Sequence, residues 1–505
     1  MNPRAPEGAP AFWPQTRDLE AGAFTTQPPR LVEDNSMRGL IFLKRGRCDL
    51  RRLFSTSGIR GVYPTEISPL LAFKLGCVLA SMFGTEGVVG VDCRLSSPVL
   101  EHALLSGLMY SGCNVRRVGL VPLPVTAYSV KRSRADFGVM ITASHNPPQY
   151  NGFKVFREGG WELMPEDERA VEESLSKELG AGRSWSDVGS CIDYEGAITE
   201  YVDDALDMLS EDGLGRRAMD LKVVVDCCNG PAALATPRLL SQLRAKVIAL
   251  NANIDGHFPG REPEPRPDVL AELGLFVRET GAHLGLAHDG DADRVAVVGP
   301  DGKFVANDRV IAYMAKRALE RGGGKVVITT IDTSRCIDEV VERLGGEVVR
   351  TKLGKTHVEL KKRSNVALAA EPWKIINPRW GPWADGILTA SMLVKDLVES
   401  GAGLYELLRD VPDYPQVRES FPCSDEDKPK VMKVVEEELE GAIGDVEDVW
   451  KYDGIRVNCK DGSWILIRAS GTEPKIRLYA EAKSVERLRE VVERGKRLVF
   501  KALRA

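Results

Sequence analysis

The sequence predicts an α/β protein in which helices cover mainly parallel or mixed β-sheets. Two observations support this fold class. First, short apolar runs typical of buried strands alternate with longer helix-like segments, as where residues 88–91 and 115–120 flank the helix-like stretch 98–111. Second, similar strand–helix units recur further along the chain, after Lys222, Lys325 and Val366.

Length and composition limit the organisation of the chain and its partners. Its 505 residues predict roughly three to four domains, and 43% hydrophobic residues allow several substantial cores. A net charge of −5 gives no reason to expect a nucleic-acid partner. Local clusters of arginine and lysine suit small phosphorylated ligands better. We therefore expect a protein of small-molecule chemistry, working as a monomer or homo-oligomer.

The ten cysteines form no CxxC pair and no framework of a small secreted domain. Cys227-Cys228 directly follows the strand-like stretch 223–226, where it is expected to pack and not to bind metal. Reduced thiols predict a cytoplasmic protein. No apolar run approaches the roughly 18 to 20 residues of a membrane span, so no membrane partner is expected.

The N-terminal segment differs from the rest of the chain. The first 36 residues contain six prolines and no amphipathic period, which predicts disorder. The basic stretch 44–52 suggests a nucleic-acid arm, but a solvated edge that leads into the first strand is the favoured interpretation. We expect residues 1–50 to form a disordered tail or an extension, with Met37 as an alternative start.

The next element is a displayed serine. The run Thr142-Ala143-Ser144-His145-Asn146-Pro147 follows the apolar stretch 137–141, which is typical of a buried strand. Pro147-Pro148 prevents a simple continuation of that strand. A hydroxyl on such a loop can accept a phosphoryl group if a metal and cations are brought to it. The alternative is a polar turn that caps a following helix.

A second loop offers that metal. It reads Asp289-Gly290-Asp291-Ala292-Asp293-Arg294 between two strand-like apolar runs. Three carboxylates at alternating positions repel one another unless a cation lies among them, and Mg²⁺ prefers such oxygen ligands. Arg294 adds a fork of donors suited to phosphate. The spacing overlaps that of a calcium-binding helix-loop-helix, but the later Gly and Glu are absent and the flanks are strand-like. A solvated acidic turn is the remaining alternative.

Two further loops are compatible with phosphate binding. Arg468-Ala469-Ser470-Gly471-Thr472-Glu473-Pro474-Lys475 lies between the strand-like stretches 464–467 and 476–479. Its arginine, hydroxyls and backbone N–H groups predict a nest for a phosphate that is held and not transferred. Near the start, Ser55-Thr56-Ser57-Gly58-Ile59-Arg60-Gly61 offers similar groups. Either segment alone is also typical of an ordinary Gly/Ser turn.

In combination and in order, these motifs resemble the α-D-phosphohexomutase superfamily, the group of phosphoglucomutases, phosphomannomutases and phosphoglucosamine mutases. The match extends from about residue 53 to the C-terminus. It also includes Asp92-Cys93-Arg94-Leu95-Ser96-Ser97-Pro98, where the family often has Asp-Thr-Arg, and the continuation of the serine loop through Tyr150-Asn151-Gly152-Phe153-Lys154.

The resemblance implies three similar α/β domains with mixed sheets and a smaller α+β C-terminal domain around a central cleft. Domain I, with the phosphoserine loop, is expected over residues 51–190, and domain II, with the metal loop, over 191–300. Domain III, with a sugar-recognition loop, is expected over 301–411. Domain IV, with the distal phosphate loop, is expected over 412–505.

The resemblance also implies an activity. Such enzymes move a phosphoryl group between the 1- and 6-positions of a hexose phosphate through a phosphoserine and a bisphosphorylated sugar, which also serves as primer. Ser144 would carry the phosphoryl group and, with Asp289, Asp291 and Asp293, hold one Mg²⁺ ion. The implied catalytic cations or proton carriers are His145, Lys154 and Arg60. The implied substrate-binding residues are Arg294, Lys352, Glu371, Trp373, Arg468, Ser470, Gly471, Thr472 and Lys475.

One loop departs from the family pattern at the position that sets sugar specificity. Relatives usually carry Gly-Glu-x-Ser-Gly-His or Gly-Glu-x-Asn-Gly, whereas this chain has Ala370-Glu371-Pro372-Trp373-Lys374-Ile375. Glu371 is retained, and Asp385-Gly386 downstream matches the family's helix-opening dipeptide. Neutral drift is one explanation. The other is a pocket reshaped for an amino sugar or a pentose, which makes phosphoglucosamine mutase and phosphopentomutase the alternative activities.

Two other classes of function are weighed against a mutase. A metal-dependent phosphatase or a kinase-like enzyme fits poorly, because the chain has no P-loop spacing and hydrolysis needs no distal phosphate clamp. A catalytically inactive sugar-phosphate sensor fits poorly because the serine, the three aspartates and the clamp arginine are all present. The sequence therefore favours a Mg²⁺-dependent isomerase whose partners are sugar phosphates.

Overall fold

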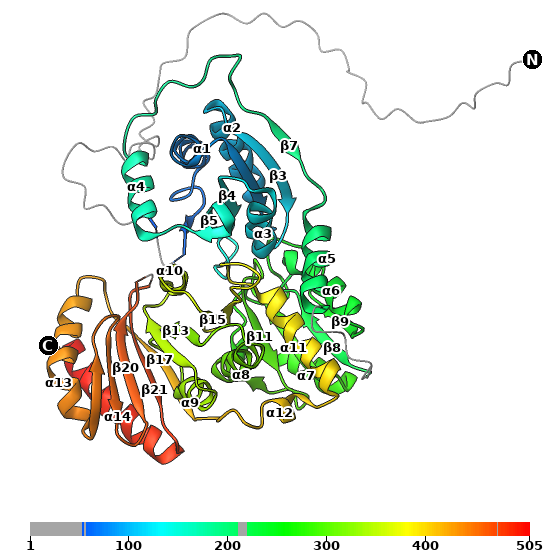
Figure 1. The fold of residues 1–505 in the computed structure, drawn as a ribbon. Coiled ribbons are helices and arrows are strands. Elements are labelled where there is room, and N and C mark those ends of the chain that lie inside the picture. Colours follow the sequence, from blue (N-terminus) through cyan, green and yellow to red (C-terminus); the bar gives the residue numbers. More distant parts are fainter. Residues whose placement is uncertain (1–52, 55–56, 211–219, 472, 505) are drawn as a thin grey trace, which may run out of the picture. The chain divides into compact units, whose positions relative to one another are not determined.

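The fold was described from a computed structural model of the chain. The structure describes residues 53–504 except 55–56, 211–219 and 472. The predicted tail, residues 1–50, lies outside the described residues. Figure 1 shows the arrangement of the elements along the chain.

The first sheet carries the loop that contains Ser144. Its segment comprises β1 (Ile59–Val62), α1 (Pro69–Phe83), β2 (Glu86–Val91), α2 (Ser97–Tyr110), β3 (Asn114–Leu120), α3 (Leu123–Ser133), β4 (Phe137–Ile141), β5 (Tyr150–Arg157), the short 3-10 helix η2 (Glu158–Gly160), β6 (Trp161–Glu162), α4 (Pro165–Leu175) and β7 (Cys191–Asp193). The strand order is β1-β5-β4-β2-β3-β7, and β6 pairs with β5. Strands β4, β2, β3 and β7 run parallel, whereas β5 is antiparallel to β4 and β1.

The second sheet carries the acidic loop. Its segment comprises α5 (Ala197–Ser210), β8 (Lys222–Asp226), η3 (Pro231–Leu234), α6 (Thr236–Gln242), β9 (Lys246–Leu250), η4 (Pro267–Val269), α7 (Ala271–Thr280), β10 (Leu284–His288), β11 (Val295–Val298) and β12 (Phe304–Val305). The order is β12-β11-β10-β8-β9. Strands β10, β8 and β9 run parallel, and β11 is antiparallel to β10 and β12.

The third sheet carries the loop with Glu371. Its segment comprises α8 (Asn307–Glu320), β13 (Val326–Thr330), α9 (Arg335–Arg343), β14 (Glu347–Thr351), α10 (Thr356–Lys362), β15 (Val366–Glu371), β16 (Lys374–Ile376), α11 (Gly386–Ser400) and α12 (Leu404–Leu407). The order is β14-β13-β15-β16, with β16 antiparallel to β15 and the other pairs parallel. Asp385 caps α11, because its side chain accepts a hydrogen bond from the N–H of Leu388.

These three sheets share one topology. In each, the first parallel strand lies between the second and the third, and a fourth strand returns antiparallel beside the third: β5-β4-β2-β3, β11-β10-β8-β9 and β16-β15-β13-β14. This repeat confirms the expected three similar α/β domains with mixed sheets. Strand β7 pairs with β3 and so belongs to the first sheet, although it begins just past the predicted boundary at residue 190.

The C-terminal domain has a different architecture. It comprises β17 (Gln416–Pro422), α13 (Lys428–Ile443), β18 (Val446–Trp450), β19 (Ile455–Cys459), β20 (Trp464–Ala469), β21 (Lys475–Glu481) and α14 (Val485–Arg504). Its five strands lie in the order β17-β21-β20-β19-β18, all antiparallel. Helices α13 and α14 contact each other and β20, so both cover the same face of the sheet (Figure 1). This is the smaller α+β domain that the sequence predicts.

Burial explains why the apolar runs form strands. Every residue of β4, β10 and β11 is buried. A strand that is covered on both faces needs a continuous apolar run and not an alternating one. Cys227 and Cys228 are buried as expected. Among the described residues, no helix combines the length and the apolar composition needed to cross a bilayer.

Candidate functional site

Three loops in equivalent positions carry most of the predicted site. Residues 142–149 join β4 to β5, residues 289–294 join β10 to β11, and residues 372–373 join β15 to β16. Each loop therefore leaves the carboxyl end of a parallel strand, the edge at which α/β sheets usually bind ligands. Since strands flank the first two loops, the alternatives of a helix-capping turn and a calcium-binding helix-loop-helix do not apply.

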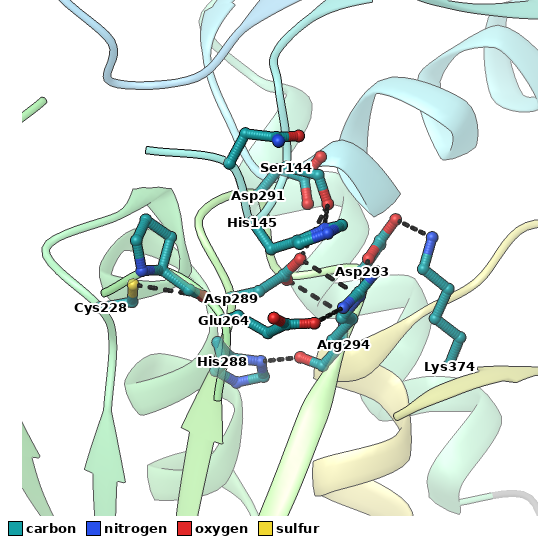
Figure 2. Close-up of polar contacts among 12 residues, drawn as sticks. Ser144, His145, Cys228, Glu264, His288, Asp289, Asp291, Asp293, Arg294 and Lys374 are labelled. Atoms are coloured by element: carbon teal, nitrogen blue, oxygen red, sulfur yellow. Dashed lines mark hydrogen bonds and ion pairs between the residues drawn. The ribbon is translucent and has the colours of Figure 1, made fainter. Parts of the chain in front are cut away.

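Ser144 is held in a fully buried position. Its backbone has a φ of 53°, a left-handed conformation that is uncommon for a residue with a side chain. Its N–H donates to Thr142 Oγ1 at 2.8 Å, and its hydroxyl donates to Asp289 Oδ2 at 2.9 Å. Thr142 Oγ1 in turn donates to Asp291 Oδ2 at 3.1 Å. The serine loop and the acidic loop are thus joined directly, as Figure 2 shows for Ser144 and Asp289.

The backbones of the two loops also approach closely at Gly290. A side chain at this position would place its Cβ 2.5 Å from the carbonyl oxygen of Ser144. That distance is shorter than van der Waals contact, so a residue larger than glycine would push the loops apart. Gly290 therefore contributes to the site by allowing the carboxylates to reach the serine.

Arg94 holds the serine loop through hydrogen bonds to its backbone. Its guanidinium is buried and pairs with Asp92 at 3.0 Å. The remaining N–H groups donate to four backbone carbonyls of the serine loop, those of Ser144, Asn146, Pro147 and Tyr150. A planar fork of fixed donors suits such a cluster of acceptors.

The three aspartates form a group suited to a cation. One ligand oxygen from each of Asp289, Asp291 and Asp293 lies within 4.8 Å of the others, and all three side chains are buried. Oδ1 of Asp291 and Oδ1 of Asp293 have no hydrogen-bond partner. Buried carboxylate oxygens without donors are costly unless a cation binds them. The donor set, all oxygen and acidic, fits Mg²⁺.

Two lysines meet on one of these carboxylates. Lys154, on β5, donates from Nζ to Asp291 Oδ2 at 2.9 Å and to Asp293 Oδ2 at 2.6 Å. Lys374, at the start of β16, donates to the same Asp293 oxygen at 2.8 Å (Figure 2). The first and third domains therefore each place a lysine against the carboxylates of the second domain.

Arg294 lies on the other side of the acidic loop. Its Nε is 3.7 Å from Asp289 Oδ2 and 3.9 Å from Asp293 Oδ1. Its Nη1 donates to Glu264 at 3.1 Å (Figure 2). The guanidinium lies 5.9 Å from the centre of the Trp373 ring. Arg294 is thus held by carboxylates and an aromatic face, and its predicted contact with phosphate stays a prediction.

The surrounding charges shift the pKa values of Asp289 and Asp293 in opposite directions. Burial, together with the negative charges of Asp293 and Asp291, raises the pKa of Asp289 well above its ordinary value. Burial opposes ionisation of Asp293 too, but Lys154, Lys374 and Arg294 hold the pKa of that carboxyl well below its ordinary value. A divalent cation would remove the repulsion that raises the pKa of Asp289.

His145 and Arg60 lie beside the serine as the sequence predicts. His145 Nδ1 is 3.4 Å from Ser144 Oγ. Burial, with the positive charges of Arg294 and Arg60, lowers the pKa of His145 well below its ordinary value, so the ring is neutral. Arg60 Nη1 donates to Asn146 Oδ1 at 3.4 Å, and its buried Nε has no partner. That orphaned donor is available to an anion.

A pocket opens next to this cluster, at the third sheet. It is lined by Ser57, Glu162, Gly354, Thr356, His357, Glu371, Lys374, Ile376 and Ala384. Glu371 Oε1 accepts a hydrogen bond from Thr356 at 2.9 Å. The retained glutamate therefore lines this pocket, and its predicted role in sugar recognition stays a prediction.

Trp373 is not among the residues that line this pocket. It packs against a buried apolar cluster of the second sheet, and its ring faces Arg294. Its backbone φ is 65°. The predicted contact of Trp373 with a sugar stays a prediction, and the structure assigns the pocket wall to Lys374 instead.

The C-terminal loop is shaped by its own hydrogen bonds. Arg468 Nη2 donates to Asp453 at 3.2 Å, while the buried Arg468 Nε has no partner. Ser470 Oγ accepts from the N–H of Glu473 at 3.2 Å. Gly471 is exposed. Lys475 Nζ binds Glu473 at 2.6 Å, which turns its charge away from an anion in the loop. Thr472 lies outside the described residues.

Lys428 supports this loop from α13. Its Nζ donates to the carbonyl oxygens of Ser470 at 2.6 Å and Glu473 at 2.7 Å. Lys352 is exposed, and the next residue, Leu353, donates its N–H to Asp453. None of the side-chain hydrogen bonds that the structure gives residues 468–475 reaches the serine or the acidic loop.

Sequence reasoning missed three residues that organise the site: Arg94, Lys374 and Lys428. Arg94 lies in a quoted motif, but its role depends on carbonyls more than fifty residues away. In the sequence, Lys374 is only one residue of the loop that departs from the family pattern. Nothing in the sequence around Lys428 indicates that it binds the turn at residue 470.

Comparison with known protein families matches nearly the whole chain after the tail. Models described as phosphoglucomutase/phosphomannomutase match in four parts. The alpha/beta/alpha domain I matches residues 51–180, domain II matches 199–302 and domain III matches 306–414. The C-terminal domain of the same family matches residues 421–497.

Individual relatives are similar over most of their length. A probable phosphoglucosamine mutase of Methanopyrus kandleri is 45% identical over 87% of this chain and 96% of its own. A phosphopentomutase of Thermococcus kodakarensis is 43% identical over 88% and 96%. Among solved structures, a phosphoglucomutase/phosphomannomutase family protein of Burkholderia thailandensis has a TM-score of 0.78 and 27% identity, covering 88% of this chain and 97% of its own.

Proposed function

The chain belongs to the phosphoglucomutase/phosphomannomutase family, and from this premise we propose that it is a phosphosugar mutase that uses Ser144 as its phosphoryl carrier. The observation that supports this role best is the 2.9 Å hydrogen bond from Ser144 Oγ to Asp289 Oδ2. It brings the acceptor hydroxyl onto the carboxylate group that is suited to a metal.

The reaction moves one phosphoryl group at a time. The P–O bond to phosphoserine 144 breaks while a new P–O bond forms to the free hydroxyl of a sugar monophosphate. The proton of the sugar hydroxyl passes to a nearby acceptor, for which neutral His145 is a candidate, and the Ser144 oxygen that leaves takes up a proton to become a hydroxyl again. The bisphosphorylated sugar then turns over, and its other phosphate returns to Ser144. A free sugar bisphosphate would prime the serine in the same way.

The cations of the site have separate tasks. A Mg²⁺ ion held by Asp289, Asp291, Asp293 and the serine oxygen would neutralise negative charge on the transferring group. Lys154 is fixed by two of these carboxylates, and the orphaned Nε of Arg60 offers a donor beside the serine loop. Both would stabilise charge that develops during transfer.

A second phosphate must be held while the first reacts. Arg468, Ser470 and Gly471 would bind it, as would Thr472, with Lys475 released from Glu473. The buried Arg468 Nε without a partner supports this assignment, because phosphate supplies the acceptor that the protein lacks. Lys352 and Arg294 are further candidates for contacts with the substrate.

The sugar is the least determined part of the proposal. Transfer between the 1- and 6-positions of a hexose phosphate is the general reaction. Two more specific activities, phosphoglucosamine mutase and phosphopentomutase, are the named activities of the relatives that are 45% and 43% identical. Glu371 would bind sugar hydroxyls at the pocket that it lines together with Lys374. Each of these sugars therefore belongs in the test.

The test measures both the isomerisation of the sugar phosphate and the release of inorganic phosphate. Purified protein is incubated with Mg²⁺, a catalytic amount of glucose 1,6-bisphosphate and the 1-phosphate of glucose, mannose, glucosamine or ribose. A mutase produces the isomeric sugar phosphate and releases no inorganic phosphate. Stoichiometric phosphate release would indicate a phosphatase instead. Binding of a sugar phosphate without either product would indicate a sensor.

A further inference from the structure

Lys374 occupies a position that the proposed mechanism does not use. Its side chain is 12% exposed and lies between two sites. On one side, its Nζ binds Asp293 Oδ2 at 2.8 Å, in the group suited to a cation. On the other, Lys374 lines the pocket that contains Glu371. Figure 2 shows the side chain reaching from β16 to Asp293.

The two lysines on Asp293 differ in how firmly they are held. Lys154 is 2% exposed and binds Asp291 as well as Asp293. For Lys374 the structure gives one ion pair among the described residues, the one to Asp293. A lysine with one such contact and a pocket beside it can exchange its partner at a lower cost than one that bridges two buried carboxylates.

Two acidic residues make the pocket a favourable environment for the positive charge of Lys374. Glu162 and Glu371 both line it, together with Lys374. Although burial disfavours a charged Glu162, the positive charges of His357, Lys374 and Lys154 lower its pKa below the ordinary value. Lys374 is therefore close enough to act electrostatically within the pocket. Its ammonium group offers three rotatable donors to the oxygen atoms of a bound ligand.

We propose that Lys374 is a positioning residue that exchanges Asp293 for the sugar phosphate when a divalent cation binds the acidic loop. The inference rests on the proposed mutase function. Before the cation binds, Lys374 neutralises Asp293. A cation on Asp293 takes over that role and repels the ammonium group, which turns into the pocket and donates to substrate oxygens.

This exchange makes the two ligands cooperative. The cation competes with Lys374 for Asp293, so the lysine weakens cation binding to the free protein. A sugar phosphate that attracts Lys374 removes the competitor and so strengthens cation binding. Because linkage is reciprocal, the cation strengthens sugar-phosphate binding by the same factor. Without an ammonium group at position 374, this part of the coupling disappears.

The test measures binding of Mn²⁺, a spectroscopic substitute for Mg²⁺, to the full chain in the Ser144→Ala background, where no group is transferred. Free Mn²⁺ is followed by electron paramagnetic resonance, with and without glucose 1-phosphate. We expect Lys374→Met to tighten Mn²⁺ binding by about fivefold or more in the absence of sugar. We expect glucose 1-phosphate to tighten Mn²⁺ binding by a similar factor with Lys374 present, and much less with Lys374→Met.

Two variants control for unrelated effects. Lys374→Arg keeps the charge and should keep most of the coupling, and thermal unfolding shows whether each variant is folded. Lys361→Met removes an exposed lysine of the same domain and should change neither constant. Equal Mn²⁺ affinity in Lys374→Met and its parent, or coupling that survives in Lys374→Met, would overturn the proposal. So would an absence of any sugar effect with Lys374 present. Failure of the mutase proposal appears separately, as absence of turnover by the wild type.

Discussion

Ser144 Oγ donates a 2.9 Å hydrogen bond to Asp289 Oδ2, although 145 residues separate the two in the chain. The contact joins the serine loop of the first sheet to the acidic loop of the second. Both loops follow the third parallel strand of the same repeated topology. A repeated fold unit thus supplies the acceptor hydroxyl from one copy and the carboxylates from the next.

Replacing Ser144 by alanine should abolish turnover, because it removes the proposed phosphoryl carrier. We expect a loss of more than about a thousandfold in kcat, typical of removing a covalent nucleophile. The free energy of unfolding should fall by no more than about 2 kcal/mol, the cost of one buried hydrogen bond. Intact-protein mass spectrometry should find one phosphate on the wild type and none at this position in the variant. Near-normal turnover by Ser144→Ala would contradict the mechanism.

Removing the metal, or one of its ligands, should have the same effect on activity. Exhaustive EDTA treatment should stop turnover, and added Mg²⁺ should restore it. Asp291→Asn should reduce metal affinity by more than about a hundredfold, since even the loss of an outer-shell partner costs ~10–100-fold. Isothermal titration with Mg²⁺ measures this directly. If activity survives chelation, the aspartates are structural.

Arg94 should matter for stability as well as activity. Arg94→Met removes the charged partner of buried Asp92 and a donor from each of four backbone carbonyls in and beside the serine loop. We expect the free energy of unfolding to fall by about 3 kcal/mol or more, with loss of serine phosphorylation. Denaturant unfolding and protein mass measure the two effects. Arg132→Met is the matched control: its side chain is 59% exposed, so it should change stability by less than about 1 kcal/mol.

The sequence predicted the fold elements well, and it brought to notice the serine and the aspartates that the structure places together. Strands such as β4 and β20 are apolar runs between polar loops, and this pattern needs no knowledge of tertiary contacts. Three aspartates at alternating positions between two apolar runs repel one another once they are buried, and this pattern can also be seen in the sequence. No comparable sequence pattern indicates the roles of Arg94 and Lys374. Their importance comes from contacts across loops and sheets, such as the one between Lys374 and Asp293, which are 81 residues apart.

Lys428 should affect substrate binding more than catalysis. Lys428→Met removes the donor that joins the carbonyls of Ser470 and Glu473, so the turn of the distal phosphate loop should loosen. We expect KM to rise by about tenfold with kcat changed much less, the signature of lost uniform binding. Steady-state kinetics with glucose 1-phosphate measures this. Lys430→Met, two residues further along α13 and exposed, should leave KM unchanged. A fall in kcat at constant KM would mean that Lys428 acts on the chemical step.

The last prediction separates two roles for Trp373. If the tryptophan contacts the sugar, as its position in the specificity loop predicts, Trp373→Ser should change the ratios of kcat/KM among different sugars. The structure instead packs Trp373 against the second sheet, with its ring facing Arg294 at 5.9 Å. On that basis we expect Trp373→Ser to lower kcat/KM by a similar factor, about tenfold, for the 1-phosphates of glucose, mannose, glucosamine and ribose, with lower thermal stability. Glu371→Gln is the matched comparison, since Glu371 lines the pocket and should alter the ratios. Unequal effects of Trp373→Ser on the four sugars would show that the ring moves into the pocket when substrate binds.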